Sequence, residues 1–481
     1  MKEKYLKRSA GVLMPIFSLP GKYSCGSFGK EAEKFIDLLV SGGFSYWQVL
    51  PFCMTDEYNS PYKSYSAFGG NPRFIDLELL FEKGIITRDE LFAAEQKTPY
   101  SCEHERLEKE RIPLLFKAAS RVSDRAPIEN FIEKNEYLAQ VCRFMAIREK
   151  NGDRPWFEWE NEEYDENVLF AWQFIQYEFF TQWAKIKEYA KKNGVKIIGD
   201  IPIYVAYDSC DVWANRDMFL TDKDGNPSSV AGVPPDYFAE DGQLWGNPLY
   251  DWKKMKADGY SWWKARMSHM LSIFDGVRID HFRGLEAFWS IPADAESAKE
   301  GKWVKGPGKS FVKAMQEISG DGLIIAEDLG DITEEVIALR DGAGYPGMRV
   351  LQFGFLGDNN SPHLPHNYVN NCIAYTGTHD NNTLLGWMWD LDADMKARAL
   401  DYFNYSGDWD KSYPTLIKAM LASAAGIVIL PIQDLLIYGS DTRLNRPGVA
   451  DGNWTYRVTA EQLNNIDWAN YKHQNGLYAR G

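Results

Sequence analysis

Short apolar runs of the kind that form buried strands recur along the whole 481-residue chain, with longer helical patterns between them. This alternation is typical of βαβ units, in which parallel strands are buried on both faces and form continuous apolar runs. Eight such runs lie at residues 11–19, 46–51, 195–201, 276–281, 323–329, 348–354, 372–378 and 426–433. Helical patterns include residues 31–40, 174–192 and 334–339. Eight units predict an α/β protein with a closed (β/α)₈ TIM barrel, which takes about 250 residues as one domain and tolerates large insertions.

The spacing of the eight runs is uneven, and two gaps are long enough to hold insertions. Residues 52–171 are charged and periodic, with helical patterns at 103–117 and 128–150, and we expect a mostly helical subdomain on the barrel rim. Residues 208–260 are rich in Pro, Gly, Trp and Tyr, which predicts a second inserted subdomain of ordered loop. We therefore expect one barrel domain over residues 1–481 that carries both insertions. Long loops after strand ends are where barrel enzymes build substrate sites.

The charge and the cysteines narrow the classes of function. A net charge of −15 at pH 7 argues against a nucleic acid or an anionic membrane as partner, because both repel an acidic chain. No apolar run approaches the roughly 20 residues that span a bilayer. Six scattered cysteines without CxxC spacing fit reduced thiols in a cytosolic protein better than a disulfide framework or a zinc site. We expect a protein that holds no metal and no other cofactor.

The N-terminus partly resembles a secretion signal, with basic residues before an apolar stretch. Glu3 breaks the basic segment, Pro15 and Pro20 interrupt the apolar stretch, and no small-x-small cleavage site follows. The pattern therefore favours a cytoplasmic location. Aromatic residues make up 14% of the chain, and their flat faces suit stacking on sugar rings, although a large core would also use many of them.

Three of the predicted strands lead into a carboxylate. Asp280 closes GVRID, Glu327 closes LIIAE, and Asp380 follows the seventh run in YTGTHD. In a barrel, residues at the C-terminal ends of strands face one shared pocket. Glycoside chemistry needs two carboxylates across the bond that breaks, one ionised and one protonated. A single acid at a strand end more often caps a helix or pairs with an arginine, but three such acids, beside Arg278 and His379, favour a catalytic site.

Several motifs resemble those of a known enzyme family. IIGDIPIYV, DGVRIDHFRG, IIAEDLG and YTGTHDNNT resemble, in order, the four conserved regions of the α-amylase clan. NSPYKSYSAFGGNP, GDIPIYVAYDSCDVWAN, AGVPPDYFAEDGQLWGNPLYDW and LNRPG are similar to motifs of glycoside hydrolase family 77, the amylomaltase or disproportionating-enzyme branch. Hydrolytic amylases usually have a His where this chain has Val205, which is normal for this branch. The resemblance covers nearly the whole chain. It implies a 4-α-glucanotransferase that uses α-1,4-glucans and maltooligosaccharides, with glucose as an acceptor, by a retaining double displacement.

The resemblance also implies roles for individual residues. Asp280 would be the nucleophile and Glu327 the acid/base, while Asp380 and His379 would hold the sugar at the cleavage site and stabilise its transition state. Arg278, two residues before Asp280 on the same strand face, would favour the ionised nucleophile by charge pairing. The other residues implied to contact sugars are Tyr62 and Asp200 at the cleavage site and Trp245, Asn247 and Asn445 at more distant glucose units.

A loop at residues 231–252 is expected to cover the acceptor side of the site. A transferase must exclude water from its covalent intermediate and bind a sugar acceptor instead. Pro234 and Pro235 would stiffen this loop, while Tyr237 and Phe238 would give it a dry face on which a sugar can stack. An ordinary surface loop is the alternative.

Three other functions stay open at this point. An α-amylase-like hydrolase would use the same three acids, and a glucan-binding regulator would have lost catalysis, although none of the three acids is missing. A metal-dependent barrel enzyme would use Asp280, His281 and His379, but adjacent residues on a strand point to opposite faces. His281 fits a core role as well as a role in the site. The sequence does not fix the oligomeric state.

Overall fold

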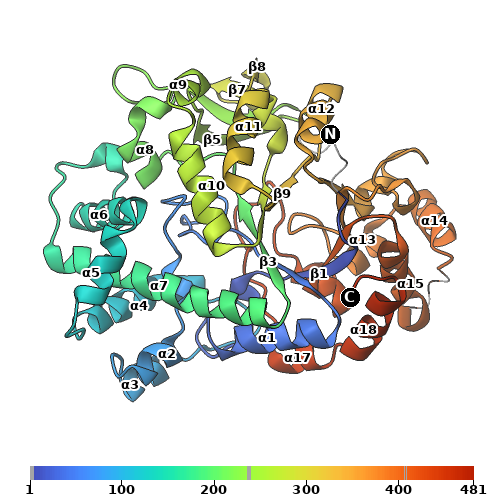
Figure 1. Ribbon diagram of the computed structural model, residues 1–481, viewed down its shortest axis with the longest axis horizontal. Helices are drawn as coiled ribbons and strands as arrows, with labels where there is room; N and C mark the ends of the chain where they lie inside the picture. The colour runs from blue at the N-terminus through green and yellow to red at the C-terminus, as the bar shows by residue number, and fades with distance from the viewer. Residues whose placement is uncertain (1–4, 236–239, 406, 408) are drawn as a thin grey trace.

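A computed structural model describes residues 5–235, 240–405, 407 and 409–481. In this part of the chain, eight parallel strands close into a barrel at the centre of the molecule (Figure 1). They are β1 (Ser9–Leu13), β2 (Tyr46–Gln48), β3 (Lys196–Ile201), β6 (Gly276–Ile279), β9 (Leu323–Ala326), β10 (Gly347–Val350), β11 (Cys372–Tyr375) and β12 (Ile427–Pro431). The strands follow one another around the barrel in chain order, and β12 pairs with β1 to close it. The predicted (β/α)₈ barrel is confirmed.

Each predicted apolar run overlaps one barrel strand, because side chains buried on both sides leave little room for polar residues. The limits of the strands differ most at β1, which begins at Ser9 and ends at Leu13, whereas the apolar run extends to residue 19. Pro15 has no N–H to donate to a neighbouring strand, and Ile16–Ser18 form a 3₁₀ turn instead. The strand therefore ends before its apolar run does.

Helices surround the barrel, and those that follow one another around it pack against each other. The outer helices are α1 (Lys30–Ser41), α7 (Glu166–Lys192), α10 (Ser261–Ile273), α11 (Gly308–Ser319), α12 (Glu334–Ala343), α15 (Trp409–Ala422) and α18 (Trp468–Leu477). Neighbours pack in the order α18, α1, α7, α10, α11 and α12, and α15 also packs against α18. In α1 the buried side chains recur at a helical period, at Ala32, Phe35, Ile36 and Leu39, so one face of the helix covers the barrel. No helix in the described ranges is long and apolar enough to cross a membrane.

Residues 52–171 contain a group of helices, and three of them overlap the helical patterns at 103–117 and 128–150. The helices are α2 (Leu77–Glu82), α3 (Arg88–Ala93), α4 (His104–Ala119), α5 (Ala126–Glu133) and α6 (Glu136–Lys150), which lie to the left of the barrel in Figure 1. Helix α7 begins at Glu166, earlier than the predicted residue 174, because the Asp165 side chain accepts a hydrogen bond from the Asn167 N–H and caps it. The insertion thus runs directly into a barrel helix.

Residues 208–260 contain helices and strands as well as the ordered loop that their composition predicts. They contain α8 (Cys210–Ala214), β4 (Ser229–Val233), β5 (Gln243–Pro248) and α9 (Trp252–Ala257), and the two strands join β7 (Ala287–Pro292) and β8 (Lys302–Lys305) in an antiparallel sheet. Gly232, Gly246 and Pro248 make β4 and β5 resemble loop, but pairing with a segment far along the chain stabilises them. The sheet lies at the top of Figure 1. The division into a catalytic barrel and subdomains at 52–171 and 208–260 stays a prediction.

The C-terminal segment supplies the remaining helices around the barrel. After β11 come α13 (Leu384–Asp390), α14 (Ala393–Tyr402) and α15, and after β12 come α16 (Ile432–Leu435), α17 (Ala460–Asn464) and α18. The loop between α16 and α17 returns to the C-terminal ends of the strands and brings Asn445 and Trp454 there. The first and last described helices of the outer layer, α1 and α18, lie side by side.

Candidate active site

Two of the three predicted acids follow neighbouring barrel strands, and the barrel holds their backbones. Asp280 follows β6 and donates its N–H to the carbonyl oxygen of Ile201 at 2.9 Å. Glu327 follows β9 and donates its N–H to the carbonyl oxygen of Ile279 at 3.1 Å. Because these bonds continue the ladder between the strands, the two acids start from fixed positions at the C-terminal end of the barrel.

Arg278 links two of the carboxylates inside the barrel. It stands on β6 directly opposite Asp200 of β3. Its Nη2 lies 2.9 Å from Asp280 Oδ1 and 2.8 Å from Asp200 Oδ2. Burial opposes the charge on Arg278, but Asp200, Tyr62 and Asp280 outweigh it and hold the pKa of the guanidinium well above its usual range. Asp280 therefore faces the permanent positive charge of a buried guanidinium.

Glu327 is held by two backbone donors and has the pKa of a proton donor. Oε2 accepts from the N–H of His281 at 2.7 Å, and Oε1 accepts from the N–H of Leu329 at 2.9 Å. Burial, and then the charge of Asp280, raise its pKa to about 8, against the opposing effects of Arg278 and the two N–H groups. Glu327 therefore carries a proton at neutral pH. A proton donor beside an ionised carboxylate is the pair that glycoside cleavage requires.

His281 adopts a left-handed backbone conformation between Asp280 and the 3₁₀ turn that follows, with φ at 52°. Non-glycine residues adopt this conformation at some cost, and it occurs often at functional sites. Here it aims the His281 N–H at Glu327, while the imidazole packs edge-on against Trp245 with ring centroids 5.0 Å apart. Burial, and then Arg283, lower the pKa of His281 to about 4, so the ring is neutral.

Asp380 and His379 form a second group on the far side of the site. His379 Nε2 lies 3.2 Å from Asp380 Oδ2, and the Asn445 amide donates to Asp380 Oδ1 at 2.7 Å. The Asn445 N–H also donates to the His379 carbonyl oxygen at 3.1 Å. Burial would raise the pKa of Asp380, but His379 and Asn445 outweigh it and lower the pKa to about 2. Asp380 is therefore ionised, and Asn445 helps to fix it.

Tyr62 connects the two groups. Its hydroxyl donates to Asp200 Oδ2 at 2.7 Å and accepts from Arg278 Nη2 at 3.1 Å. Its ring stacks on His379, with centroids 4.9 Å apart and the planes 17° from parallel. Burial, and then Asp200, raise the pKa of Tyr62 well above its usual range, so the hydroxyl stays protonated. The network therefore runs unbroken from Asp280 through Arg278 and Tyr62 to His379.

A cavity of about 550 Å³ lies over this network. Seven of the predicted site residues line it, namely Tyr62, Trp245, Asn247, Asp280, His379, Asp380 and Asn445. Asp200 and Arg278 lie behind Tyr62 and Asp280 and are almost wholly buried. Glu327 also lies behind the lining, next to the backbone of His281. Tyr237 and Phe238 fall outside the described residues.

Comparison with known proteins identifies the family. A family model described as 4-alpha-glucanotransferase, glycoside hydrolase family 77, matches residues 14–463. The chain is 44% identical over 481 residues to the 4-alpha-glucanotransferase of Streptococcus pneumoniae, which covers 95% of this chain and 94% of that enzyme. The chain belongs to the 4-alpha-glucanotransferase family. The 4-alpha-glucanotransferase of Thermus thermophilus is 41% identical over 488 residues, covering 95% of this chain and 96% of that enzyme.

Solved structures agree with the family assignment. The amylomaltase of Streptococcus agalactiae, solved in complex with acarbose, matches with a TM-score of 0.95 and 37% identity, covering 99% of this chain and 100% of that one. The resemblance seen in the sequence motifs to this glucanotransferase family is confirmed. As a member of a glycosyl-transferring family, the chain has its network of acids at the end of the barrel where such enzymes act.

Several residues of this 4-alpha-glucanotransferase family member line the cavity without having been predicted. They include Tyr58, Tyr204, Leu244, Arg446 and Trp454. Trp454 is the most informative, because its ring lies 6.0 Å from that of Tyr62 and 5.9 Å from that of His379. Nothing in the sequence around it distinguishes this tryptophan from one in the core. Over the ranges that the structure describes, no group of three or more His, Cys, Asp or Glu side chains is placed to hold a metal ion.

Proposed function

We propose that this chain transfers segments of α-1,4-glucans to the 4-hydroxyl of an acceptor glucose or glucan, with Asp280 as nucleophile and Glu327 as acid/base. The observation that carries this proposal is the contrast between the two acids. Asp280 lies 2.9 Å from the buried Arg278 guanidinium, whereas the pKa of Glu327 is raised to about 8. A carboxyl group that is paired with a cation suits the nucleophile, and a carboxyl group that holds its proton at neutral pH suits the acid.

In the first step, a carboxylate oxygen of Asp280 attacks C1 of the donor sugar and the bond from C1 to the leaving oxygen breaks. Glu327 gives its proton to that oxygen, and the shortened glucan departs. A sugar now remains bonded to Asp280, with its anomeric configuration inverted. The retaining mechanism requires the two carboxyl groups to lie roughly 5–6 Å apart.

In the second step, Glu327 removes the proton from the acceptor 4-hydroxyl as the hydroxyl oxygen attacks C1. The bond between C1 and Asp280 breaks, which inverts the configuration again and restores both acids. Asp380 and His379 would bind hydroxyls of the sugar at the cleavage site and stabilise its positively charged transition state. Asp200 would act through Arg278 and Tyr62, since its side chain is enclosed by them.

One part of the cavity wall is apolar and supports transfer over hydrolysis. Trp245 and Leu244 of β5 line it, and Trp245 is fixed against His281 next to the reacting acids. The Asn247 amide donates to the Val205 carbonyl oxygen at 2.9 Å, which leaves its own oxygen for a sugar hydroxyl. We propose that these residues bind the acceptor, that Tyr62 stacks beneath the sugar at the cleavage site, and that Tyr237 and Phe238 contribute to covering the acceptor.

The products formed from maltotriose test this function. Transfer yields glucose together with oligosaccharides longer than the substrate, and the number of reducing ends stays constant. An α-amylase-like hydrolase would instead raise the number of reducing ends and make no longer product. Transfer without net reducing-end formation is the expected result, and a steady rise in reducing ends without longer products would contradict it.

We further propose a cytoplasmic location and a role in maltodextrin, glycogen or starch metabolism. The six cysteines are all free thiols, and five are buried, which fits a reducing compartment. Neutral α-1,4-glucans are the partners that the cavity and the net charge of −15 support, because an acidic chain repels nucleic acids and anionic membranes.

A further inference from the structure

Helix α4 of the insertion begins at a histidine that lies between Arg73 and Trp454, and Trp454 lines the cavity. His104 Nδ1 lies 3.2 Å from Arg73 Nη1, and His104 Nε2 lies 3.0 Å from the carbonyl oxygen of Trp454. A guanidinium can only donate, so Nδ1 accepts and the single proton resides on Nε2, which donates to Trp454. His104 is therefore neutral, with both ring nitrogens paired. Burial, and then the charge of Arg73, lower its pKa to about 4, in agreement with this assignment.

On one side, His104 holds a residue in a strained conformation. Trp454 has a φ of 61°, which is unfavourable for a large side chain. Its N–H donates to the Leu444 carbonyl oxygen at 2.7 Å, and its carbonyl oxygen accepts from His104. The indole lines the cavity and faces Tyr62 and His379. Strain of this kind persists only where the surroundings fix it.

On the other side, the contact extends to the loop that carries Tyr62. Arg73 Nη1 also donates to Asn59 Oδ1 at 2.6 Å. Asn59 has a φ of 62° and lies three residues before Tyr62. Helix α4 also holds the backbone here, because Arg111 Nη1 donates to the Arg73 carbonyl oxygen at 3.1 Å. One helix thus contacts the supports of both aromatic residues.

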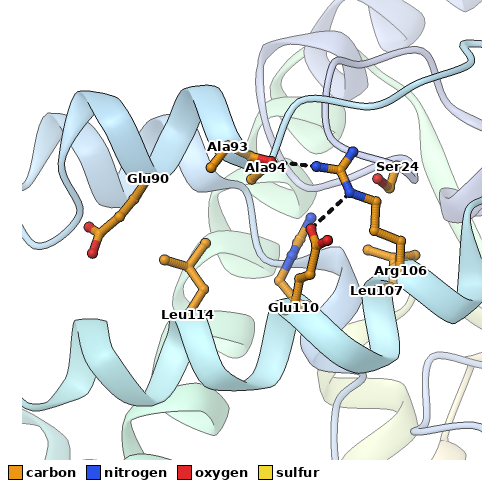
Figure 2. A pocket seen from close by; sticks show the side chains of 9 residues that line it. Ser24, Glu90, Ala93, Ala94, Arg106, Leu107, Glu110 and Leu114 are labelled. Carbon is orange, nitrogen blue, oxygen red and sulfur yellow. Dashed lines mark hydrogen bonds and ion pairs between the residues drawn. The ribbon is translucent and has the colours of Figure 1, made fainter.

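The start of α4 is itself firmly anchored. The Cys102 N–H donates to the Thr455 carbonyl oxygen at 2.7 Å, and the Arg457 N–H donates to the Tyr100 carbonyl oxygen at 3.1 Å, so the segment before α4 pairs with the segment after Trp454. Figure 2 shows Arg106 of α4 reaching the carbonyl oxygen of Ala93 at the end of α3 and the carboxylate of Glu110. The start of α4, from which His104 projects, is therefore fixed to the segment after Trp454 and to the end of α3.

We propose that His104 is a positioning residue for the cleavage site: it holds Trp454 directly, and Tyr62 through Arg73 and Asn59, in the geometry that the sugar requires. The proposal rests on the proposed function, since it names what positions the wall of that same site. The helical insertion would then support catalysis, although none of its described helices contributes an acid to the site.

The test compares His104→Ala with His104→Gln and with Leu115→Ala, a change at a fully buried residue of the same helix. Gln retains an amide that can donate to the Trp454 carbonyl oxygen. Each variant is assayed with α-glucosyl fluoride, by fluoride release, and with maltotriose, well below its melting temperature. Leu115→Ala should lower the melting temperature but leave kcat/KM unchanged, because it removes packing alone.

His104→Ala should lower kcat for both donors about tenfold to a hundredfold with a smaller change in KM, as expected for displaced contacts to the reacting sugar. His104→Gln should retain most of the kcat that His104→Ala loses. Should His104→Ala keep kcat/KM within about twofold of the wild type while its melting temperature falls, as in Leu115→Ala, the histidine is merely structural. Equal losses in the Ala and Gln variants would also overturn the proposal.

A second variant covers the case in which His104→Ala fails to fold. Asn59→Gly keeps the left-handed backbone but removes the oxygen that accepts from Arg73. It should lower fluoride release in the same way, and an unchanged rate would contradict the link to Tyr62. If the wild type releases fluoride but makes no longer oligosaccharide, the glucanotransferase function is wrong, while the ratio of variant to wild-type fluoride release still tests His104.

Discussion

The carboxylate of Glu327 accepts a hydrogen bond from the backbone N–H of His281 at 2.7 Å, so the proposed acid/base is tied to the residue next to the proposed nucleophile. Any shift of β6 moves both acids together. The same closeness makes their charges interact, and the charge of Asp280 helps burial to keep the proton on Glu327.

The pH dependence of catalysis should differ between donors. Glu327 has a pKa of about 8, so it should lose its proton, and with it the first step, as the pH rises through that value. kcat/KM for maltotriose should therefore fall about tenfold per pH unit above pH 8. α-Glucosyl fluoride needs no proton to release fluoride, so its kcat/KM should lack this decline. Parallel alkaline declines for the two donors would contradict the assignment.

The pH dependence of the free energy of unfolding should also reveal the proton on Glu327. The pKa is raised from 4.5 in the unfolded chain to about 8 in the folded one, so between these values only the folded state holds the proton. The contribution of Glu327 to folding stability is therefore fully present below pH 4.5 and is lost as the pH rises to 8. Glu327→Gln cannot titrate, so its stability relative to the wild type should increase by up to about 1.4 kcal/mol per pH unit within this window. Urea unfolding at pH 5.5 and pH 8 measures the change, and a pH-independent difference would count against the raised pKa.

Asp280→Asn should abolish transfer and leave the fold intact. Arg278 keeps Asp200 as a charged partner, so the substitution leaves no buried charge unpaired. The loss of a nucleophile should lower kcat by about 10⁴-fold or more. Asp321→Asn, at the exposed loop before β9 and so at the opposite end of the barrel, is the control and should be fully active. Loss of activity accompanied by unfolding would show that Asp280 is structural.

Asn445→Ala should separate two roles for this residue. If Asn445 acts by fixing Asp380, kcat/KM should fall about tenfold to a hundredfold for α-glucosyl fluoride and for maltotriose alike, as for the loss of a hydrogen bond to a charged group. If it acts only by binding a distant glucose, the single-sugar donor should be unaffected. Asn247→Ala is the matched comparison, because its amide contacts Val205 and not an acid. We expect losses with both donors for Asn445 and with maltotriose alone for Asn247.

The barrel could be predicted from the sequence because its strands are buried on both sides. Burial forces a continuous apolar run such as LIIA in β9, and a run of this kind marks a strand whatever its neighbours are. The small sheet could not be found in the same way. β4 and β5 are short and glycine-containing, and their partner β7 lies in a segment that no pattern connects with them. Their strand conformation is decided by tertiary pairing and not by local preference.

The acids of the site were predictable for a related reason, because the ends of predicted strands place residues such as Asp280 and Glu327 at one face of the barrel. His104 and Trp454 were not. His104 lies at the start of a charged helix in the insertion, and Trp454 lies in a loop near the C-terminus, 350 residues away along the chain. Only the folded structure brings them together, so no spacing in the sequence could reveal the contact.

The covalent intermediate on Asp280 is the central claim, and the intact mass of Glu327→Gln incubated with α-glucosyl fluoride tests it most directly. The fluoride departs without a proton, so Asp280 should still be glycosylated, but the variant lacks the base that activates an acceptor hydroxyl. We predict that the protein accumulates with the added mass of one glucosyl group on the peptide that contains Asp280, and that azide, which needs no base, releases it as the α-glucosyl azide. An unmodified mass together with near-normal turnover of maltotriose would contradict both the nucleophile and the acid/base assigned here.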